Sequence, residues 1–476
     1  MKSLPLSIGC IHFIGIGGIG MSGIAQVLHA LGYHVTGSDQ ARSAGTQRLE
    51  NDGIQIYIGH KADYVENTAL VVISSAVSES NAELARARAL MIPVVRRADM
   101  LAELMRLKWS IGIAGTHGKT TTTSLVGAML EVGGLDPTII NGGIINAYSS
   151  NALIGKGDWL VAEADESDGT FTRLPATIAV VTNIDPEHME YYGSFENLRA
   201  AFINFITRIP FYGFVVLCTD HGQVQSLIPQ IADRRIITCG LSPQADVRGV
   251  NLRFDAQGSY FDVEIQNRRD KTTDLIKDFF TPLHGKHNVQ NVLAALAVGI
   301  EMQIPSEGLR TAMASFKGVH RRFTYVGVGG GIRIIDDYAH HPIEIECVLQ
   351  AARQIHSAPA RVIVLVQPHR YSRLMALYDD FCACFNHADI VVIAPVYAAG
   401  EAPIEPFDHH HLARGIRERG HRQVHTIDDP DAVAATIAQV AQPGDTLLCL
   451  GAGSITQWAA ALPAQLDRAM MTKEGS

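Results

Sequence analysis

The stretch Ala114-Gly115-Thr116-His117-Gly118-Lys119-Thr120-Thr121 combines the residue types that bind phosphate groups. It follows the apolar run Ile111 to Ala114 and precedes a segment with a helical pattern, Thr122 to Glu131. A glycine turn between a strand and a helix presents backbone N–H groups and the positive helix end to an anion. A lysine at this turn reaches the outer phosphates, and the next threonine hydroxyl binds magnesium. The sequence therefore predicts a nucleoside triphosphate site, although Ile113 occupies the first glycine position of a strict P-loop.

A second glycine motif, Gly15-Ile16-Gly17-Gly18-Ile19-Gly20, lies near the amino terminus. It follows the apolar run Ile11 to Ile16 and precedes the helical pattern Met21 to Leu31, and Asp39 closes the next apolar run. This order is typical of a turn that seats a diphosphate on a helix N-terminus. Taken by itself the motif favours NAD, so a dehydrogenase is one open interpretation of the first hundred residues.

Two polar clusters follow apolar runs in the same block as the lysine loop. Glu163-Ala164-Asp165-Glu166-Ser167-Asp168 comes after Trp159 to Ala162, and Thr182-Asn183-Ile184-Asp185-Pro186-Glu187-His188 comes at the end of Ile178 to Thr182. Ligands bind at the carboxyl ends of parallel strands, and carboxylates suit Mg²⁺. A solvated acidic loop and a structural histidine are the alternatives for each cluster alone. Their place beside a phosphate loop favours a metal–nucleotide site.

Further polar groups lie in the second half of the chain. His287-Asn288-Val289-Gln290-Asn291 opens a long helical run, and its two asparagines fall on one helical face. The others are Arg321-Arg322-Phe323, Asp336-Asp337-Tyr338-Ala339-His340-His341-Pro342 and Gln367-Pro368-His369-Arg370-Tyr371-Ser372-Arg373. Guanidinium groups bind carboxylates and phosphates through a planar fork. These groups predict contacts to substrates, with an N-cap for Asn288 and surface positions for the arginines as alternatives.

Apolar runs alternate with helical patterns in three successive blocks, which is typical of parallel sheets covered by helices. We therefore predict an α/β fold with three domains. They are a Rossmann-like N-terminal domain over residues 1–108, a P-loop-type central ATPase domain over residues 109–319 and a Rossmann-like C-terminal domain over residues 320–476. Polar segments from Asp246 to Asp274 predict hairpins, and Val326 to Ile332 predicts a hairpin turn.

The composition describes a folded multi-domain protein, with 476 residues of which 47% are hydrophobic and 18% charged. A net charge of −9 argues against a partner nucleic acid. The chain has neither an apolar run of bilayer length nor a cationic secretory signal, so we expect no membrane contact and a cytoplasmic location. The seven cysteines form no C-x-x-C pair and are expected to be free thiols. The run His409-His410-His411 predicts a solvated loop or helix start rather than a metal site.

Together these motifs resemble the Mur ligases of bacterial peptidoglycan synthesis, over essentially the whole chain. The resemblance rests on eight segments in the family's order: GIGGIGMSGIA, GTHGKTTTT, EADESDGTF, TNIDPEHMEYY, HNVQN, HRRF, DDYAHHP and QPHRYSR. It implies ATP-dependent amide formation between the lactyl carboxylate of UDP-N-acetylmuramate and L-alanine, through an acyl phosphate. ATP would be the co-substrate and Mg²⁺ or Mn²⁺ the cofactor, and we expect a monomer or a weak homodimer.

The resemblance also implies roles for individual residues. The catalytic residues would be Lys119, Asn288, Asn291, Arg322 and Asp337. ATP would contact Gly115, Thr116, His117, Gly118, Lys119, Thr120, Thr121, Asn288, Arg322 and Asp337. The UDP-sugar would contact Gly15, Gly17, Gly18, Gly20, Asp39 and Ser74. The amino acid and the muramoyl group would face Tyr338, His340, His369, Arg370 and Arg373, and the metal would be held by Thr120, Glu166 and His188.

Three other functions stay open. A related ligase adds a whole tripeptide to the same sugar nucleotide and shares GTHGKT, but its first glycine motif usually departs from GIGGIGM. A dehydrogenase would use Gly15 to Asp39 and leave the Lys119 loop and everything after it unexplained. A non-catalytic nucleotide sensor would not need the acidic and arginine clusters.

Overall fold

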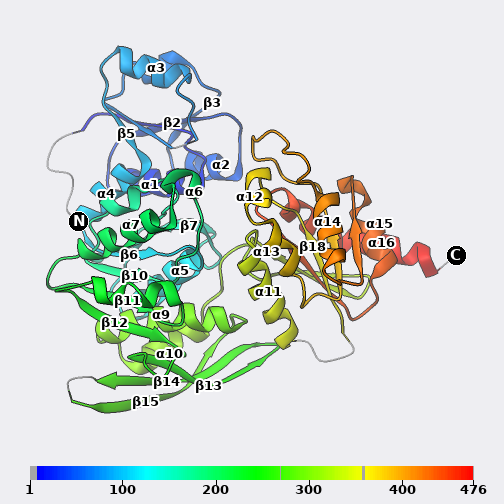
Figure 1. Cartoon of the computed structure of the whole chain (residues 1–476). Coiled ribbons are helices and arrows are strands. Elements are labelled where there is room, and N and C mark those ends of the chain that lie inside the picture. The colour runs from blue at the N-terminus through cyan, green and yellow to red at the C-terminus, as the bar shows by residue number, and fades with distance from the viewer. Residues whose placement is uncertain (1–7, 75, 268–269, 356–359, 475–476) are drawn as a thin grey trace. The chain divides into compact units, whose positions relative to one another are not determined.

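The described part of the chain forms three β-sheets, each accompanied by helices (Figure 1). The computed structural model describes residues 8–74, 76–267, 270–355 and 360–474. The three-domain α/β architecture confirms the predicted fold class. The domain boundaries after residues 108 and 319 stay predictions. Within the described ranges, no helix combines the length and the apolar character needed to cross a membrane.

The first sheet has five parallel strands in the order β3-β2-β1-β4-β5. The strands are β1 (Ile11–Ile14), β2 (Val35–Asp39), β3 (Gln55–Ile58), β4 (Leu70–Ile73) and β5 (Val94–Arg96). The helices are α1 (Ile19–Ala30), α2 (Ala44–Asn51), α3 (Ala82–Ala89) and α4 (Arg97–Arg106). Because all five strands run the same way, their carboxyl ends meet at one edge of the sheet.

The second sheet has ten strands in the order β15-β14-β13-β12-β11-β10-β6-β9-β7-β8. The strands are β6 (Trp109–Ala114), β7 (Thr138–Ile145), β8 (Ser150–Leu153), β9 (Trp159–Glu163), β10 (Ile178–Val181), β11 (Phe214–Cys218), β12 (Arg235–Gly240), β13 (Val247–Asp255), β14 (Gly258–Asn267) and β15 (Thr272–Thr281). The helices are α5 (Lys119–Val132), α6 (Met189–Tyr192), α7 (Phe195–Thr207), α8 (Gly222–Gln225), α9 (Lys286–Glu301) and α10 (Ser306–Ala314). Strands β13 to β15 are the hairpins that the polar segments predicted.

The third sheet has six strands in the order β16-β17-β21-β18-β19-β20. The strands are β16 (Thr324–Gly329), β17 (Ile332–Asp337), β18 (Val362–Val366), β19 (Ile390–Ile393), β20 (Val424–Thr426) and β21 (Thr446–Leu450). The helices are α11 (Pro342–Ile355), α12 (Tyr371–Ala376), α13 (Tyr378–Ala383), α14 (His409–Glu418), α15 (Val433–Val440) and α16 (Ile455–Glu474). Strands β16 and β17 are antiparallel, which confirms the predicted hairpin, and the other pairs are parallel.

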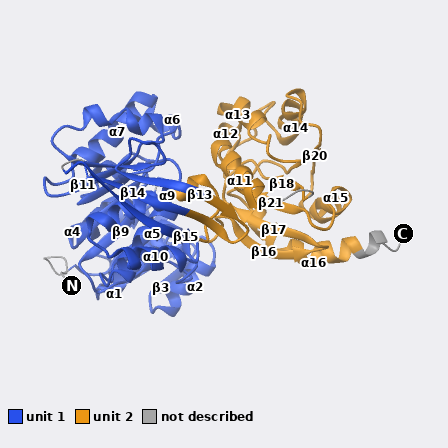
Figure 2. Cartoon of the chain, turned by 90° about the horizontal axis from the view of Figure 1, so that it is seen from below, with its two compact units in different colours: residues 1–252, 261–280, 290–319 blue, residues 253–260, 281–289, 320–476 orange. Residues whose placement is uncertain are grey.

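The chain divides into two compact units (Figure 2). The first unit comprises residues 1–252, 261–280 and 290–319, and the second comprises residues 253–260, 281–289 and 320–476. Within the first unit, α1 packs directly on the second sheet. A Cβ at Gly23 of α1 would lie 2.8 Å from Nδ2 of Asn151 in β8, and Asn151 donates a hydrogen bond to the Ile19 carbonyl. The N-terminal and central sheets therefore share one hydrophobic core.

Candidate active site

Residues 115–118, called the phosphate loop below, join β6 to α5. Gly118 caps the helix with a φ of 79°, a left-handed conformation that strains any residue with a Cβ. A Cβ there would also lie 2.4 Å from Oδ1 of Asn291, so only glycine fits at this place beside α9. No side chain caps α5, and its first turn carries no acidic residue. The N–H groups of this helix end are therefore available to an anion.

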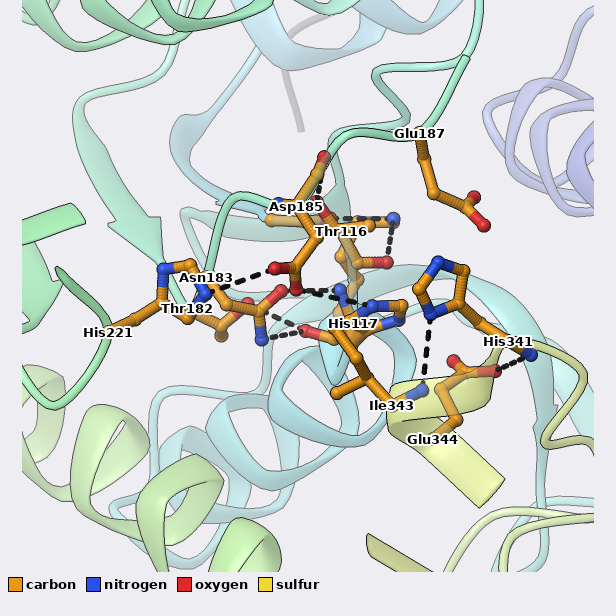
Figure 3. A network of polar contacts seen from close by, with 12 residues as sticks. Thr116, His117, Thr182, Asn183, Asp185, Glu187, His221, His341, Ile343 and Glu344 are labelled. Atoms are coloured by element: carbon orange, nitrogen blue, oxygen red, sulfur yellow. Dashed lines mark hydrogen bonds and ion pairs between the residues drawn. The ribbon is translucent and has the colours of Figure 1, made fainter. Parts of the chain in front are cut away.

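Residues 182–185, which follow β10, hold the phosphate loop in place through hydrogen bonds (Figure 3). The His117 N–H donates to Oδ1 of Asn183 at 2.7 Å, and Oγ1 of Thr182 donates to the His117 carbonyl at 2.7 Å. The Asp185 N–H donates to Oγ1 of Thr116 at 2.8 Å. These contacts fix the backbone of the loop in advance of any ligand, which lowers the entropy cost of binding.

The Asp185 carboxylate lies between two imidazole rings (Figure 3). Its oxygens are 3.4 Å from Nε2 of His117 and 3.2 Å from Nε2 of His221. Burial raises the pKa of the Asp185 carboxyl, but the hydrogen bonds to both rings outweigh it and hold the pKa far below its usual range. Asp185 is thus an anion that orients the His117 ring. Asp185 belongs to the predicted polar cluster after β10, but it was not among the individually predicted site residues.

Lys119, the first residue of α5, folds back over the phosphate loop. Its Nζ donates to the carbonyls of Gly115 at 2.6 Å and Thr116 at 3.0 Å, and lies 2.8 Å from Oε2 of Glu166. Burial lowers the pKa of the Lys119 ammonium, but the carboxylates of Glu166 and Glu163 outweigh it and raise the pKa to about 12. Lys119 is therefore a cation at every physiological pH.

Thr120, a predicted metal ligand, contacts Glu163. Its Oγ1 donates to Oε2 of Glu163 at 3.0 Å, and the Gly142 N–H donates to the same oxygen at 2.8 Å. Glu163 opens the acidic cluster predicted for this site, but it was not among the predicted metal ligands. It ends β9, and the parallel register of β9 with β6 pairs it with Ile113, two residues before Gly115. The first carboxylate after an apolar strand was the signal that could have found it.

His188, another predicted metal ligand, caps α6 with a φ of 57°. Its ring nitrogens lie 3.6 Å from a Glu187 oxygen and 3.7 Å from a Glu190 oxygen. The Tyr192 hydroxyl donates to the Glu166 carbonyl, so α6 is tied to the segment that carries Glu166. The metal-binding roles of Thr120, Glu166 and His188 stay predictions.

The amino-terminal glycine turn lies at the carboxyl edge of the first sheet. The Gly17 N–H donates to Oδ2 of Asp39 at 2.8 Å, so Asp39 braces the turn. Gly15 has a φ of 78°, and a Cβ there would lie 3.9 Å from Oγ of Ser74. Gly18 caps α1 without a side-chain hydrogen bond, and the first turn of α1 has no acidic residue. The predicted UDP-sugar residues, Gly20 included, therefore gather around an uncapped helix end.

The two predicted asparagines lie three positions apart on α9. Oδ1 of Asn291 faces the phosphate loop, as its approach to Gly118 shows. Nδ2 of Asn288 donates to the His284 carbonyl at 2.8 Å, which anchors the start of α9 to the segment before it. Asn291 is thus placed at the phosphate loop, while the contact of Asn288 to a nucleotide stays a prediction.

In the second unit, Asp337 ends β17 and is buried. Its carboxylate accepts hydrogen bonds from the N–H groups of Phe323 at 2.6 Å and Ala339 at 2.7 Å. Burial raises the pKa of the Asp337 carboxyl to about 6, against the lowering effect of Arg322 and of these hydrogen bonds. The Arg322 guanidinium lies 5.3 Å from the centre of the Tyr338 ring. The structure therefore gathers the predicted Arg322, Asp337 and Tyr338, and their contacts to ATP and substrate stay predictions.

The other predicted residues of this unit also lie together. Nδ1 of His340 is 2.9 Å from the Tyr338 carbonyl, and the His340 and His369 ring centres are 5.9 Å apart. Nη1 of Arg373 lies 3.3 Å from Nδ1 of His369, and Arg370 caps the helix α12 that carries Arg373. Burial, helped by His340 and Arg373, lowers the pKa of His369 to about 4. The His369 ring is therefore neutral above that pH and can accept a hydrogen bond.

Two further expectations are confirmed. All seven cysteines are free thiols. His409 begins α14, capped by Asp408, so the histidine run is a helix start. The ligand atoms of His409, His410 and Asp428 lie within 4.8 Å of one another. Each of the two rings contacts Asp428, at 2.8 and 2.9 Å.

Family models for Mur ligases match most of the chain. The "Mur ligase family, catalytic domain" model matches residues 10–109, the "Mur ligase middle domain" model matches residues 113–299, and the "Mur ligase, glutamate ligase domain" model matches residues 321–453. The three matches follow one another in chain order and account for each of the three sheets.

Two curated relatives of nearly full length share one name. The chain is 58% identical over 467 residues to the UDP-N-acetylmuramate–L-alanine ligase of Rhodospirillum centenum, covering 98% of this chain and 96% of that one. It is 57% identical over 463 residues to the protein of that name from Brucella anthropi, covering 97% and 98%. The solved UDP-N-acetylmuramate–alanine ligase of Thermotoga maritima superposes with a TM-score of 0.78 at 26% identity, covering 98% and 99%. A murein peptide ligase from Psychrobacter arcticus shares the fold, with a TM-score of 0.70 at 21% identity, covering 96% and 99%.

Proposed function

Since the chain belongs to the Mur ligase family, we propose that it is an ATP-dependent ligase joining L-alanine to the lactyl carboxylate of UDP-N-acetylmuramate in peptidoglycan synthesis. The observation that carries the proposal is the identity of 57 to 58%, over nearly the full length, to ligases of that name. The first unit supports it with a phosphate loop and a separate glycine turn, because the reaction uses one triphosphate and one sugar nucleotide. The dehydrogenase alternative has no support, since the family models match the blocks that it left unexplained.

The proposed reaction has two steps. A carboxylate does not acylate an amine until one of its oxygens becomes part of a leaving group. In the first step a lactyl carboxylate oxygen attacks the γ-phosphorus of ATP, the bond to the β–γ bridging oxygen breaks, and ADP leaves. In the second step the alanine nitrogen attacks the acyl carbon and loses a proton, and inorganic phosphate leaves to give the amide. Such transfers depend on positioning and charge neutralisation more than on a covalent side chain.

The phosphate loop would hold the triphosphate at the N-terminus of α5. We propose that residues 115–121 contact the β- and γ-phosphates and that Lys119 gives up its bonds to the loop carbonyls for a phosphate oxygen. Two features support this role: the ammonium of Lys119 is charged, with a pKa of about 12, and it is buried beside the uncapped helix end. A fixed positive charge in such a place stabilises the negative charge that develops during transfer.

The side chains around the loop fit a magnesium ion, which prefers hard oxygen ligands. The Thr120 hydroxyl is hydrogen-bonded to a carboxylate, and the buried carboxylate of Glu166 is held by Lys119. We propose that Thr120, Glu166 and His188 bind Mg²⁺ or Mn²⁺, with Glu163 orienting the Thr120 hydroxyl. When bound, the ion would neutralise charge on the triphosphate.

The remaining roles follow the family resemblance and stay proposals. The glycine turn with Asp39 and Ser74 would seat the UDP-sugar, and α9 would present its two asparagines to the nucleotide. Arg322 and Asp337 would contact ATP. The cluster of Tyr338, His340, His369, Arg370 and Arg373 would face the amino acid and the muramoyl group. A cytoplasmic location and a monomeric or weakly dimeric state belong to the same proposal.

A coupled ADP-release assay tests the function. Purified protein receives ATP, Mg²⁺ and UDP-N-acetylmuramate with L-alanine, glycine, L-serine or the tripeptide, and products are identified by mass. The expected result is ADP release that needs both the sugar nucleotide and L-alanine. Turnover with the tripeptide alone would identify the recycling ligase instead, and ADP release that ignores the sugar nucleotide would refute the proposal.

A further inference from the structure

Arg97 lies at the same sheet edge as the glycine turn. It is the first residue of α4 and directly follows β5. Gly15, Asp39 and Ser74 directly follow or end β1, β2 and β4, which belong to the same parallel sheet. Arg97 is therefore the cation that this topology adds to a group of residues already predicted to bind a diphosphate. The sequence motifs did not include it.

The guanidinium of Arg97 lies against the first turn of α1. A Cβ at Gly20 would be 3.0 Å from Nη1 and 3.1 Å from Cδ of Arg97, so the glycine makes room for this side chain. Nη2 donates to Oδ2 of Asp165 at 2.9 Å. The side chain of Arg97 is 21% exposed and that of Asp165 is 37% exposed, so the pair is open to solvent and to a ligand.

The charges at this place favour an anion. The N-terminus of α1 has neither a side-chain cap nor an acidic residue in its first turn, and helix N-termini attract anions. A guanidinium has five N–H donors in a planar fork, and Asp165 engages the Nη2 side. The Nη1 side faces Gly20 and the turn.

We propose that Arg97 binds the diphosphate of the UDP-sugar on the glycine turn. The inference rests on the proposed function and names a binding residue that the motifs missed. It also links the two sites of the first unit along the chain. Asp165 directly precedes Glu166, whose carboxylate holds Lys119 at the phosphate loop. The Arg97–Asp165 ion pair therefore ties the segment that carries Glu166 to α4, the helix that carries Arg97.

A purely structural ion pair is the competing explanation, and it makes a different prediction. If Arg97 only ties α4 to the segment after β9, removing either partner should have the same effect. If Arg97 binds the diphosphate, Arg97→Met should weaken ligand binding while Asp165→Asn should not, because an asparagine oxygen still accepts a hydrogen bond. Arg106→Met, an exposed arginine of the same helix paired with Glu103, is the matched control.

Calorimetric titration of the full-length variants with UDP-N-acetylmuramate, without turnover, tests the inference. We expect the Kd of Arg97→Met to rise roughly 10- to 100-fold, as for loss of a charge-assisted hydrogen bond. Asp165→Asn and Arg106→Met should stay within about threefold of the wild type. Equal weakening by Arg97→Met and Asp165→Asn, or an unchanged Arg97→Met, would overturn the role. Absence of binding to the wild type would instead overturn the proposed function.

Two further ligands locate the interaction on the sugar nucleotide. UDP-N-acetylglucosamine lacks the lactyl carboxylate, so a diphosphate contact predicts the same loss for both sugar nucleotides. A loss confined to UDP-N-acetylmuramate would place Arg97 at the carboxylate and contradict the diphosphate assignment. Binding of a non-hydrolysable ATP analogue should be unchanged in Arg97→Met, which also shows that the variant is folded.

Discussion

Nζ of Lys119 lies 2.8 Å from Oε2 of Glu166, and both side chains are buried, at 13% and 2% exposure. The lysine is the last residue of the glycine-lysine signature, and the glutamate lies 47 positions further along the chain. A pair of this kind holds the ammonium at the end of α5 before a nucleotide arrives. It also ties the stability of the first unit to the residues that we propose for phosphate transfer.

Lys119→Met should abolish ATP-dependent phosphate release and destabilise the protein. Removing one partner of a buried ion pair leaves the other uncompensated, which costs about 3 kcal/mol. The double variant Lys119→Met/Glu166→Gln removes that buried charge, so it should regain most of the lost stability without regaining turnover. Urea unfolding and an ADP-release assay measure the two effects. Turnover in either variant would contradict the role of Lys119.

Gly118→Ala should weaken ATP binding more than its backbone strain explains. Gly118 and Gly134 both have left-handed φ values, 79° and 76°, but a Cβ at Gly134 would meet nothing within 4 Å. Gly134→Ala should therefore lose only about 1 kcal/mol, the usual cost of this conformation for alanine. Gly118→Ala adds the clash with Asn291, so we expect a larger loss of stability and at least a tenfold weaker affinity for an ATP analogue, by calorimetry. Equal behaviour of the two variants would show that the Asn291 contact is unimportant.

Glu163→Gln should raise the magnesium concentration needed for half-maximal activity, by about tenfold, with little change in melting temperature. A glutamine oxygen still accepts the hydrogen bonds of Thr120 and Gly142, but the negative charge beside the proposed metal position is gone. Glu66→Gln, which changes an exposed carboxylate paired with Arg86, is the control for loss of one negative charge. An unchanged magnesium titration would remove Glu163 from the site.

Loss of His369 should make the protein less sensitive to mild acid. The pKa of His369 is about 4 in the folded chain against about 6.5 in an unfolded one. Between these values the unfolded chain binds a proton that the folded chain does not, so stability falls as the pH drops from 6.5 to 4. His369→Gln should remove part of this fall, about 1 kcal/mol once solvent screening of this half-buried ring is allowed for, measured by urea unfolding at pH 7 and pH 4.5. His410→Gln, at a half-exposed histidine, should leave it unchanged, and an identical pH profile for all three proteins would refute the prediction.

The sequence by itself determined the fold class and the places of the glycine turns and polar clusters along the chain. The apolar runs Trp159 to Ala162 and Ile178 to Thr182 begin where β9 and β10 begin, and each ends within one residue of the end of its strand. These predictions succeed because a parallel strand is buried on both faces and reads as a continuous apolar run. Glycine turns and polar clusters directly after such runs mark the ligand edge of the sheet, which is why Lys119 and Asp39 could be placed from local pattern alone.

The sequence did not predict β7 and β8, whose apolar pattern is broken by Asn141 and Asn151. Both strands pack against α1, with Asn151 bonded to the Ile19 carbonyl. The asparagines in these strands form hydrogen bonds to neighbouring helices, which compensates for burying polar groups. Because such long-range contacts are not visible in the local sequence pattern, β-propensity did not predict these strands. The hydrophobic core shared by the first two sheets was not predicted either, because it depends on the contacts of α1 with β7 and β8.

Only the tertiary structure decided which polar or charged partner each carboxylate of this site contacts. The acidic run that begins at the end of β9 offers several carboxylates, of which the family resemblance implies Glu166 as a metal ligand. The register of β9 on β6 puts Glu163 beside Thr120, while Glu166 turns to Lys119 and Asp165 reaches Arg97, 68 positions earlier. Residues one to three positions apart in an irregular segment point in different directions, and only the packing around them fixes those directions. Local pattern therefore locates a site, and long-range pairing assigns its side chains.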